Sequence, residues 1–552
     1  MASDSAAPRA DSPVAGTGGR DPKWWTLTAV CTGVFMLLLD ITIVNVALPD
    51  IQTELHASLS DLQWVIDAYA LSLAALLLTA GSLADLYGRR RVFVIGLVLF
   101  TAGSIACGAA QDIFFLQISR AFQGIGGAAM FATALALLAS AFHGKDRGTA
   151  FGVFGATTGV AVAIGPVLGG ALTSGLSWRW IFFVNIPICL VALTVSLMRV
   201  AESKDPAAGR PDWFGFVSFS LSLGALVYGL IEAGQTSWGE QRVVLSLVAS
   251  GLLLVVFLIS QVVQDKPMFD LGLLRKPTFT GGLIAAFGVS ASIFSLLTFL
   301  VIYVQNVLGY SAVDTGVRFL FLSGASFVAA AIAGRLTEHV PVRWLIAPGF
   351  LILGVGLLLV HGIQDGSSWT HLIPGLLVAG VGIGMINPPL ASTAVGVVPV
   401  ARAGMASGVN STFRQVGIAT GIAALGSIFS QQVADAVRPG LAGKVPPQAL
   451  DGLTSALSGG QVSAAAAGAQ QAATAAQGPS AGQQAYDLVH QVGTSAVVDA
   501  LNHVTLIAAV IAFTAGLLSL VLIRQKDFVA RGPQGPSDEA ASSVPQEAGP
   551  PR

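Results

Sequence analysis

The sequence predicts an all-α polytopic membrane protein with fourteen transmembrane helices and both termini in the cytoplasm. Three observations support this prediction: the composition, the number of long apolar segments, and the positions of the basic residues between them. Of the 552 residues, 54% are hydrophobic and only 10% are charged. A soluble protein carries about a quarter charged residues, and each unpaired charge in hydrocarbon is costly. A lipid bilayer as the surrounding medium accounts for this shortage of charge.

Fourteen segments contain the roughly 20 apolar residues that a helix needs to cross the hydrocarbon core. They lie near residues 26–47, 62–83, 92–110, 113–142, 149–172, 180–198, 213–232, 243–264, 279–303, 316–333, 343–361, 371–398, 405–430 and 501–523. Cytoplasmic loops are enriched in Lys and Arg, and a cytoplasmic N-terminus places most of the 28 basic residues on that side. The exceptions are four external residues and three within spans: Arg179, Arg242, Arg438, Lys444, Arg120, Arg318 and Arg414.

An internal repeat organises the spans into two bundles. Residues 81–85 resemble residues 334–338, and residues 147–152 resemble residues 402–408, so helices 2 and 5 correspond to helices 10 and 13. Corresponding helices are therefore eight apart in the helix count. Two adjacent six-helix bundles would give a separation of six, and two helices inserted between the bundles account for the other two. Parallel repeats of this kind suit alternating access by rocking of two halves around a central site.

The predicted organisation therefore has seven parts. They are a disordered cytoplasmic tail at 1–23, a six-helix bundle at 24–200, two inserted helices at 201–265, helices 9–13 at 266–430, an external loop at 431–500, helix 14 at 501–524 and a cytoplasmic tail at 525–552. The loop at 431–500 is rich in Ala, Gln, Gly and Ser. Surface helices, a flexible cover over the outer opening and disorder all remain open for it.

A short charged turn joins the second and third spans. It contains the candidate gate residues Gly81, Asp85, Gly88, Arg89 and Arg90. A turn this tight places the two helices side by side, and its arginines mark the cytoplasmic face. We expect Asp85 to pair with an Arg or to cap a neighbouring helix, which would hold an inner gate closed in one state. The alternative is that the arginines only fix the topology.

Three ionisable residues lie at a common depth within the first bundle. Asp40, Asp67 and Arg120 all fall roughly 8–10 Å below the external surface at 1.5 Å per residue. Intramembrane charges are by default functional candidates, so we expect the three side chains to meet in a cavity, with Gln123 nearby. The alternative for each acid is a structural ion pair inside the bundle.

The fifth span has a dense pattern of small residues that permits close helix packing. The pattern consists of Gly155, Gly159, Gly165, Pro166, Gly169 and Gly170. Pro166 removes one backbone hydrogen bond and bends the helix. A bent, smooth helix suits a sliding seal between the two halves, and the alternative is a generic packing helix.

These motifs together resemble the major facilitator superfamily, and more closely its fourteen-helix drug/proton antiporters of the EmrB/QacA type. The resemblance covers residues 25–525 and includes motifs in residues 39–49, in the 81–91 turn, in residues 120–126 and in the fifth span. The turn carries Leu86 where the family commonly has an Arg, which removes one expected cytoplasmic charge contact.

The resemblance implies roles for individual residues. Asp40 is expected to be the proton and substrate site, Asp67 a substrate-selecting charge near the outer mouth, and Arg120 their electrostatic partner. Burial favours the protonated form of a carboxyl group and a nearby cation favours the ionised form. Competition between a proton and a cationic or polar drug would therefore couple export to proton entry. The expected cavity-lining residues are Asn45, Gln123, Asn387 and Arg414.

The predicted function is a proton-coupled antiporter that exports amphipathic drug-like or antibiotic compounds across the bacterial inner membrane. The alternative is a dedicated exporter of one native metabolite or lipid, and the fifth-span motif argues against an importer. The sequence shows no catalytic or metal-ligand spacing and no phosphate-binding loop. We therefore expect no enzyme activity, no cofactor, no metal and no nucleic-acid partner, with a proton gradient as the energy source and a monomer as the working unit.

Overall fold

The structure of the protein is a computed structural model. It describes residues 22–57, 59–142, 146–205, 211–264, 267–337 and 339–528. This part of the chain consists of helices and short connections, without a β-strand. Thirteen of its helices are long and apolar enough to cross a membrane. The 30-residue helix α5 (Asp146–Gly175) is the further helix that would complete the predicted count of fourteen, which stays a prediction.

The N-terminal half comprises seven helices that pack around one another. They are α1 (Pro22–Leu55), α2 (Leu59–Tyr87), α3 (Arg89–Gly108), α4 (Ile113–Ala141), α5 (Asp146–Gly175), α6 (Trp180–Phe183) and α7 (Asn185–Arg199). Helix α4 lies between α2 and α3, and α1 lies between α5 and α7. The carboxylate of Asp112 caps α4 by accepting a hydrogen bond of 2.8 Å from the backbone N–H of Phe115.

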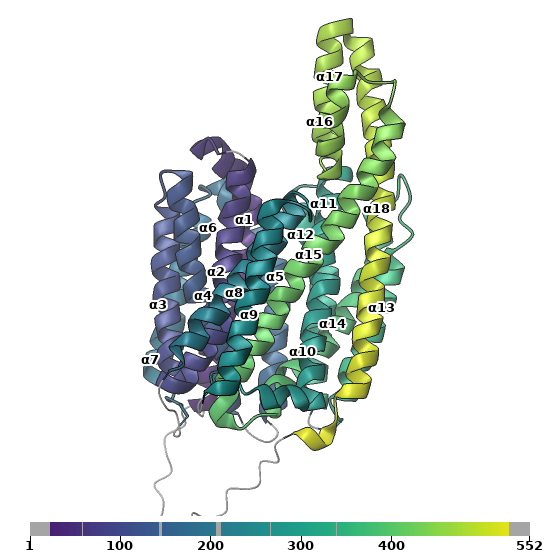
Figure 1. The fold of residues 1–552 in the computed structure, drawn as a ribbon. Coiled ribbons are helices and arrows are strands. Elements are labelled where there is room, and N and C mark those ends of the chain that lie inside the picture. The colour runs from purple at the N-terminus through teal and green to yellow at the C-terminus, as the bar shows by residue number, and fades with distance from the viewer. Residues whose placement is uncertain are drawn as a thin grey trace, which may run out of the picture.

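Two helices, α8 (Trp213–Gln235) and α9 (Gln241–Val263), follow the N-terminal half. They pack against each other, and α8 also contacts α2 and α15. Figure 1 shows the pair in front of the junction between the two halves. Helix α9 is mostly exposed outside α8, as expected for a helix that faces lipid.

The C-terminal half contains broken as well as continuous helices. Its elements are η1 (Leu271–Arg275), α10 (Pro277–Val289), η2 (Ser290–Phe294), α11 (Ser295–Ile302), η3 (Tyr303–Val307), α12 (Ala312–Leu336), α13 (Arg343–Val360), η4 (Trp369–His371), α14 (Leu372–Gly396), η5 (Val400–Arg402), α15 (Ala403–Leu441), α18 (Pro479–Leu522) and η6 (Gln525–Asp527). The turns η2 and η3 are π-helical and interrupt one long span. Such turns occur frequently at functional sites.

For residues 431–500 the sequence left surface helices, a flexible cover and disorder open, and the structure of this segment is helical. Helices α15 and α18 extend beyond the body of the protein and carry α16 (Pro447–Ser458) and α17 (Val462–Gln477) between them. Phe429, Val433, Val437 and Leu441 recur every four residues and are all buried, so the apolar core of the C-terminal half continues into the protrusion. This periodicity is that of an amphipathic helix.

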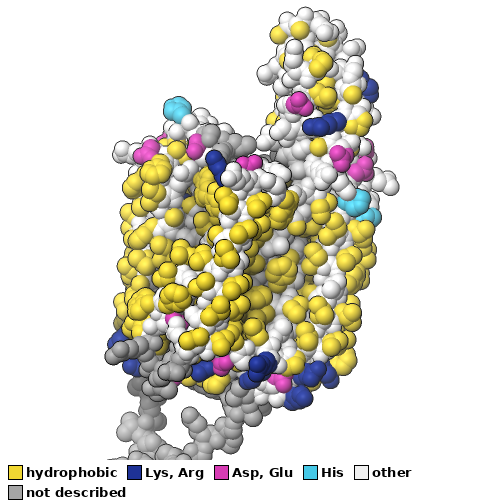
Figure 2. Space-filling model, viewed as in Figure 1, with side chains coloured by type: hydrophobic (Ala, Val, Ile, Leu, Met, Phe, Trp, Pro, Cys, Tyr) yellow, Lys and Arg dark blue, Asp and Glu magenta, His cyan; other side chains and the backbone are white. Residues whose placement is uncertain are grey.

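The surface of the molecule agrees with a membrane orientation. Figure 2 shows hydrophobic side chains over the lateral face in view and Lys and Arg side chains gathered at the end opposite the protrusion. Cytoplasmic ends of membrane proteins carry this excess of basic residues. We therefore infer that the protrusion formed by α15 to α18 lies on the external side.

Candidate functional site

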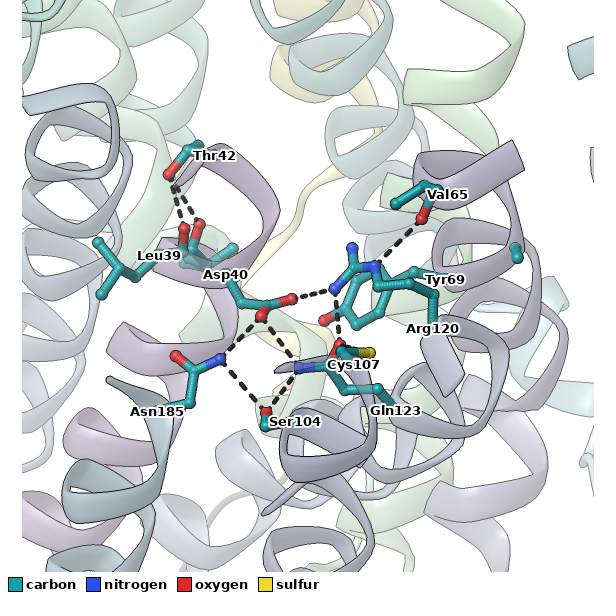
Figure 3. A network of polar contacts seen from close by, with 12 residues as sticks. Leu39, Asp40, Thr42, Val65, Tyr69, Ser104, Cys107, Arg120, Gln123 and Asn185 are labelled. Atoms are coloured by element: carbon teal, nitrogen blue, oxygen red, sulfur yellow. Dashed lines mark hydrogen bonds and ion pairs between the residues drawn. The ribbon is translucent and has the colours of Figure 1, made fainter. Parts of the chain in front are cut away.

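A buried ion pair joins α1 to α4 at the centre of the N-terminal half. Arg120 Nη1 lies 2.6 Å from Asp40 Oδ2, and the two residues are 1% and 0% exposed (Figure 3). At this separation each charge neutralises the other, which offsets part of the cost of burying both. The structure thus brings together two of the three ionisable residues that the sequence selects.

Amide and hydroxyl groups complete the environment of the Asp40 carboxylate. Its Oδ1 atom accepts hydrogen bonds from Gln123 Nε2 at 3.0 Å and from Asn185 Nδ2 at 2.8 Å. The same two amide nitrogens donate to Ser104 Oγ, at 2.8 and 3.3 Å respectively. Gln123 was expected in this region, whereas Ser104 and Asn185 were not. An amide inside the apolar segment 180–198 is the signal that could have identified Asn185.

Arg120 makes further contacts that fix its orientation. Its Nε donates to the carbonyl of Val65 at 3.1 Å, and Nη1 donates to Gln123 Oε1 at 2.6 Å. The guanidinium carbon lies 4.3 Å from the ring centroid of Tyr69, a distance typical of a cation–π contact. The Tyr69 hydroxyl and the Asn185 carbonyl oxygen are buried and have no hydrogen-bond partner within the described residues. The network therefore joins α1, α2, α3, α4 and α7 and retains two unused polar atoms.

Among the described residues, Asp40 and Arg120 are almost completely buried, whereas they were expected to line a cavity together with Asp67. Asp40 is sealed within the network, so no cargo molecule contacts it here. Asp67 is only partly buried. Val65 and Tyr69 of α2 face Arg120. Because a shift of two residues turns a side chain about 200° around a helix, Asp67 lies on a different face of α2.

The face of α2 that carries Asp67 points toward the other parts of the molecule. Leu71 and Ala74 follow Asp67 at the spacing of one helical face. They pack against Val227 of α8 and Val416 of α15. Asp67 is therefore positioned toward the region between the halves, separate from the Asp40 network.

At the cytoplasmic ends, Asp85 connects the two halves. Its carboxylate accepts hydrogen bonds from Arg89 Nε at 3.0 Å, from Arg89 Nη2 at 2.8 Å, and from the backbone N–H groups of Gly404 at 2.8 Å and Met405 at 2.7 Å. Arg89 Nη2 also donates to the carbonyl of Ala401 at 2.8 Å. Asp85 thus pairs with an Arg and also caps the first turn of α15, where a negative charge is stabilised.

A second carboxylate supports the turn between α2 and α3. Glu202 accepts hydrogen bonds from the backbone N–H groups of Arg90 at 3.0 Å and Arg91 at 3.1 Å. Gly88 precedes them with a φ of 115°, and a Cβ atom there would lie within 2.8 Å of the Glu202 carboxylate. The guanidinium of Arg90 donates to the carbonyl of Leu197. No feature of the sequence pattern predicts that Glu202 belongs to this turn.

The small residues of α5 contact helices of both halves. A Cβ on Gly155 would contact Pro388 of α14, one on Gly159 would face Ser326 of α12, and one on Gly165 would overlap Thr42 of α1. A Cβ on Gly170 would overlap the side chain of Val313 of α12, and Gly169 is buried. The side chains of Pro166 and of the predicted cavity residue Asn45 lie outside the described part of the structure.

The remaining two predicted cavity residues contact each other in the C-terminal half. Arg414 Nη2 of α15 donates to Asn387 Oδ1 of α14 at 3.0 Å. The candidate site therefore consists of three separate polar groups within the spans: the Asp40 network, Asp67, and the Arg414–Asn387 pair.

An ion pair closes the outer end of the N-terminal half. Glu54 of α1 pairs with Arg179 and accepts a hydrogen bond of 2.7 Å from Trp178 Nε1. Arg179 Nη2 also donates to the carbonyl of Ala110 at 3.0 Å. The hydrogen bond from Arg179 lowers the pKa of Glu54, so this carboxylate stays ionised and the contact persists across the physiological range.

The fold and the intramembrane charges define a multi-pass membrane transporter, and sequence comparison identifies its family. The sequence profile of the Major Facilitator Superfamily matches residues 30–422. The chain is 37% identical over 422 residues to the multidrug resistance protein Stp of Mycobacterium tuberculosis, covering 76% of this chain and 78% of that protein. It is 37% identical over 417 residues to the puromycin resistance protein pur8 of Streptomyces alboniger, covering 74% and 82%. The chain therefore belongs to the Major Facilitator Superfamily.

Further comparisons agree with this assignment. The tetracenomycin C resistance and export protein of Streptomyces glaucescens is 32% identical over 427 residues, covering 77% of this chain and 79% of that protein. Among solved structures, a bacterial homolog of the human lysosomal transporter Spinster matches with a TM-score of 0.52 at 19% identity, covering 93% of this chain and 100% of that chain. The protein is thus a bacterial membrane transporter of small molecules and not an enzyme.

Proposed function

We propose that this protein is a proton-coupled antiporter that exports amphipathic drug-like or antibiotic compounds across the bacterial inner membrane by alternating access. The names of its relatives support drug export, since they describe multidrug resistance, puromycin resistance, and tetracenomycin C resistance and export. The observation that carries proton coupling is the fully buried ion pair between Asp40 and Arg120.

Protonation of Asp40 would change the balance of forces inside the N-terminal half. The ionised carboxylate accepts three side-chain hydrogen bonds and neutralises Arg120. Protonation leaves the guanidinium buried without its counter-ion, and loss of one partner from a buried pair costs about 3–5 kcal/mol. A different arrangement of α1 against α4, with more water at Arg120, would relieve that cost.

This change can act on the interface between the halves. Helix α1 carries Asp40 and packs along α5, and α5 packs along α12 of the C-terminal half. A cargo molecule therefore does not have to touch Asp40. Cargo that binds preferentially to the state with the closed ion pair promotes proton release, and a proton promotes the other state.

The decisive experiment is transport against a gradient in proteoliposomes with an imposed pH difference. Wild-type protein should accumulate ethidium or puromycin on the acidic side, and Asp40→Asn should only equilibrate the compound. Glu240→Gln, which removes an exposed carboxylate outside the spans, is the matched control and should pump normally. Uphill transport by Asp40→Asn would show that Asp40 is not the proton site.

A dedicated exporter is the second candidate, because two of the three relatives described above are named after single compounds. They are the puromycin resistance protein pur8 and the tetracenomycin C resistance and export protein. A panel of chemically unrelated compounds in the same proteoliposome assay separates the two. Export of several unrelated compounds supports the drug exporter, whereas export of one scaffold alone supports the dedicated exporter.

A further inference from the structure

Arg414 is a cation near the middle of the membrane without a carboxylate beside it. It lies eleven residues after the start of α15 at Ala403, which places it about 16 Å from the cytoplasmic end of that helix. Within the described residues it forms no ion pair, and its hydrogen-bond acceptor is the amide oxygen of Asn387 at 3.0 Å. Arg120, by comparison, has Asp40 as its counter-ion.

A neutral acceptor does not balance a charge that lies within the membrane. A guanidinium within the hydrocarbon region costs several kcal/mol and is normally paired or directed into a water-filled cavity. The guanidinium also has five donors in a planar fork, and a single amide oxygen uses one of them. The charge of Arg414 is therefore available to an anion that the described protein residues do not supply.

Other unused polar groups lie on the same face of α15. Ser407, Asn410 and Arg414 are separated by three and four residues, so they share one face of the helix. Ser407 is 0% and Asn410 is 1% exposed, and the Ser407 hydroxyl and the Asn410 amide nitrogen have no hydrogen-bond partner within the described residues. Two buried donors therefore accompany the guanidinium.

The surroundings of Arg414 belong to the region where the halves meet. Its partner Asn387 is 8% exposed and precedes Pro388, which contacts Gly155 of α5 in the N-terminal half. About one turn farther along α15, Gly417 packs against Ser290 at the start of the π-helical turn η2. A broken helix and an interface between moving halves are the features expected beside a transport site.

We propose that Arg414 and Asn387 form an anion-binding subsite that receives a carboxylate or a similar acidic group of the cargo. This inference rests on the proposed function and adds a substrate class to it: compounds that carry an acidic group on an amphipathic body. The guanidinium fork matches a carboxylate in two parallel hydrogen bonds, and the amide of Asn387 fixes the orientation of the fork.

Binding of two dyes with one scaffold tests the subsite directly. Carboxyfluorescein is anionic and rhodamine 123 is cationic, and both have a xanthene ring system. Fluorescence anisotropy with the full-length protein in nanodiscs should show that Arg414→Gln weakens carboxyfluorescein binding at least about tenfold more than rhodamine 123 binding. Arg414→Lys should lie between wild type and Arg414→Gln, because it keeps the charge and loses the fork. Arg438→Gln, which removes an exposed arginine of the protrusion, should change neither affinity.

Each result has one meaning. Wild type that binds no carboxyfluorescein overturns the subsite, and so does an equal loss of both dyes in Arg414→Gln and Arg414→Lys, which would indicate that Arg414 only holds α14 against α15. If Arg414→Gln does not fold, the same ratio of affinities measured for Arg414→Lys and Asn387→Ala decides. Wild type that binds carboxyfluorescein but transports no compound would refute the proposed function and leave the subsite intact.

Discussion

Two carboxylates of the N-terminal half, those of Asp40 and Asp67, lie in different environments. Asp40 is sealed by Arg120, Gln123 and Asn185 and has no exposed surface. Asp67 is partly buried, on the face of α2 that continues through Leu71 toward α8 and α15. The first environment suits a proton and excludes a large molecule. The second can place a negative charge near a cation that enters between the halves.

We expect Asp67→Asn to change which compounds are transported rather than whether transport is coupled. Loss of the carboxylate should reduce export of cations such as ethidium about tenfold, the effect of roughly 1.4 kcal/mol of lost attraction, and should affect neutral compounds much less. The measurement is the initial efflux rate for charged and neutral compounds in the same vesicles. Asp50→Asn, an exposed acid on α1, is the control. An equal loss for every compound would argue against a charge-selecting role.

Site residues could be predicted where the sequence alone shows that placing them in the membrane costs free energy. Charged and amide side chains inside apolar segments select Asp40, Arg120 and Gln123, because burial requires a partner. Ser104 is also part of the network, but a serine in a membrane helix can satisfy its own helix backbone and therefore gives no such signal. Which face of α2 reaches Arg120 depends on packing, so the separation of Asp67 from this network required the structure.

Elements near the cytoplasmic surface form a latch between the halves. The end of α2 supplies Asp85, and the first turn of α15 supplies two backbone N–H donors. The charge of Asp85 also meets the positive end of the α15 dipole. The turn into α3 is in turn held by Glu202. The latch therefore depends on the closed arrangement of α2 and α15 and is lost when their ends separate.

Asp85→Asn should favour the state in which the cytoplasmic ends are apart. Hydrogen bonds to a charged group contribute about 1.5–3 kcal/mol, so the population of the separated state should rise about tenfold or more. The measurement is the labelling rate of a cysteine at Met405 by a maleimide added from the cytoplasmic side. Asp270→Asn, which breaks an exposed ion pair with Arg402, provides the control. Unchanged labelling of the Asp85→Asn protein would mean that the contact does not hold the gate.

The helical protrusion shows why the sequence left three alternatives open for residues 431–500. Its composition of Ala, Gln, Gly and Ser resembles that of a loop, and the low charge gives no clear boundary. The apolar residues Val433, Val437 and Leu441 nevertheless follow the helical period and are buried against α18 and its neighbours. Composition was therefore a poorer guide than periodicity, because a helix needs only one apolar face to pack.

The whole molecule repeats one contact at two places on its cytoplasmic side. A Cβ on Gly81 of α2 would overlap the carbonyl of Gly404 and meet the Cα of Gly408 in α15. A Cβ on Gly334 of α12 would meet the carbonyl of Gly148 and the Cα of Gly152 in α5. These residues correspond through the internal repeat. The crossing of α2 with α15 is therefore equivalent to the crossing of α12 with α5, with the N-terminal and C-terminal halves interchanged.

Equivalent crossings should respond alike to the same change. Gly81→Leu and Gly334→Leu each insert a side chain where backbones touch, and overpacking of this kind costs about 1–3 kcal/mol. We expect both to disfavour the closed cytoplasmic state to a similar extent. Double electron–electron resonance between spin labels at the exposed positions 91 and 335, in a background without the three native cysteines, should show more of the longer distances.

The control for this experiment lies in the same membrane but outside the crossings. Gly251 of α9 has open space around its Cα, so Gly251→Leu adds the same side chain without meeting another backbone. Its distance distribution should match that of the protein with glycine at all three positions. A shift in only one of the two crossing variants would mean that the halves do not close as a symmetric pair. A leucine cannot fit between touching backbones without displacing one of them. If neither variant shifts the distance distribution, the two crossings are therefore not part of the interface that moves.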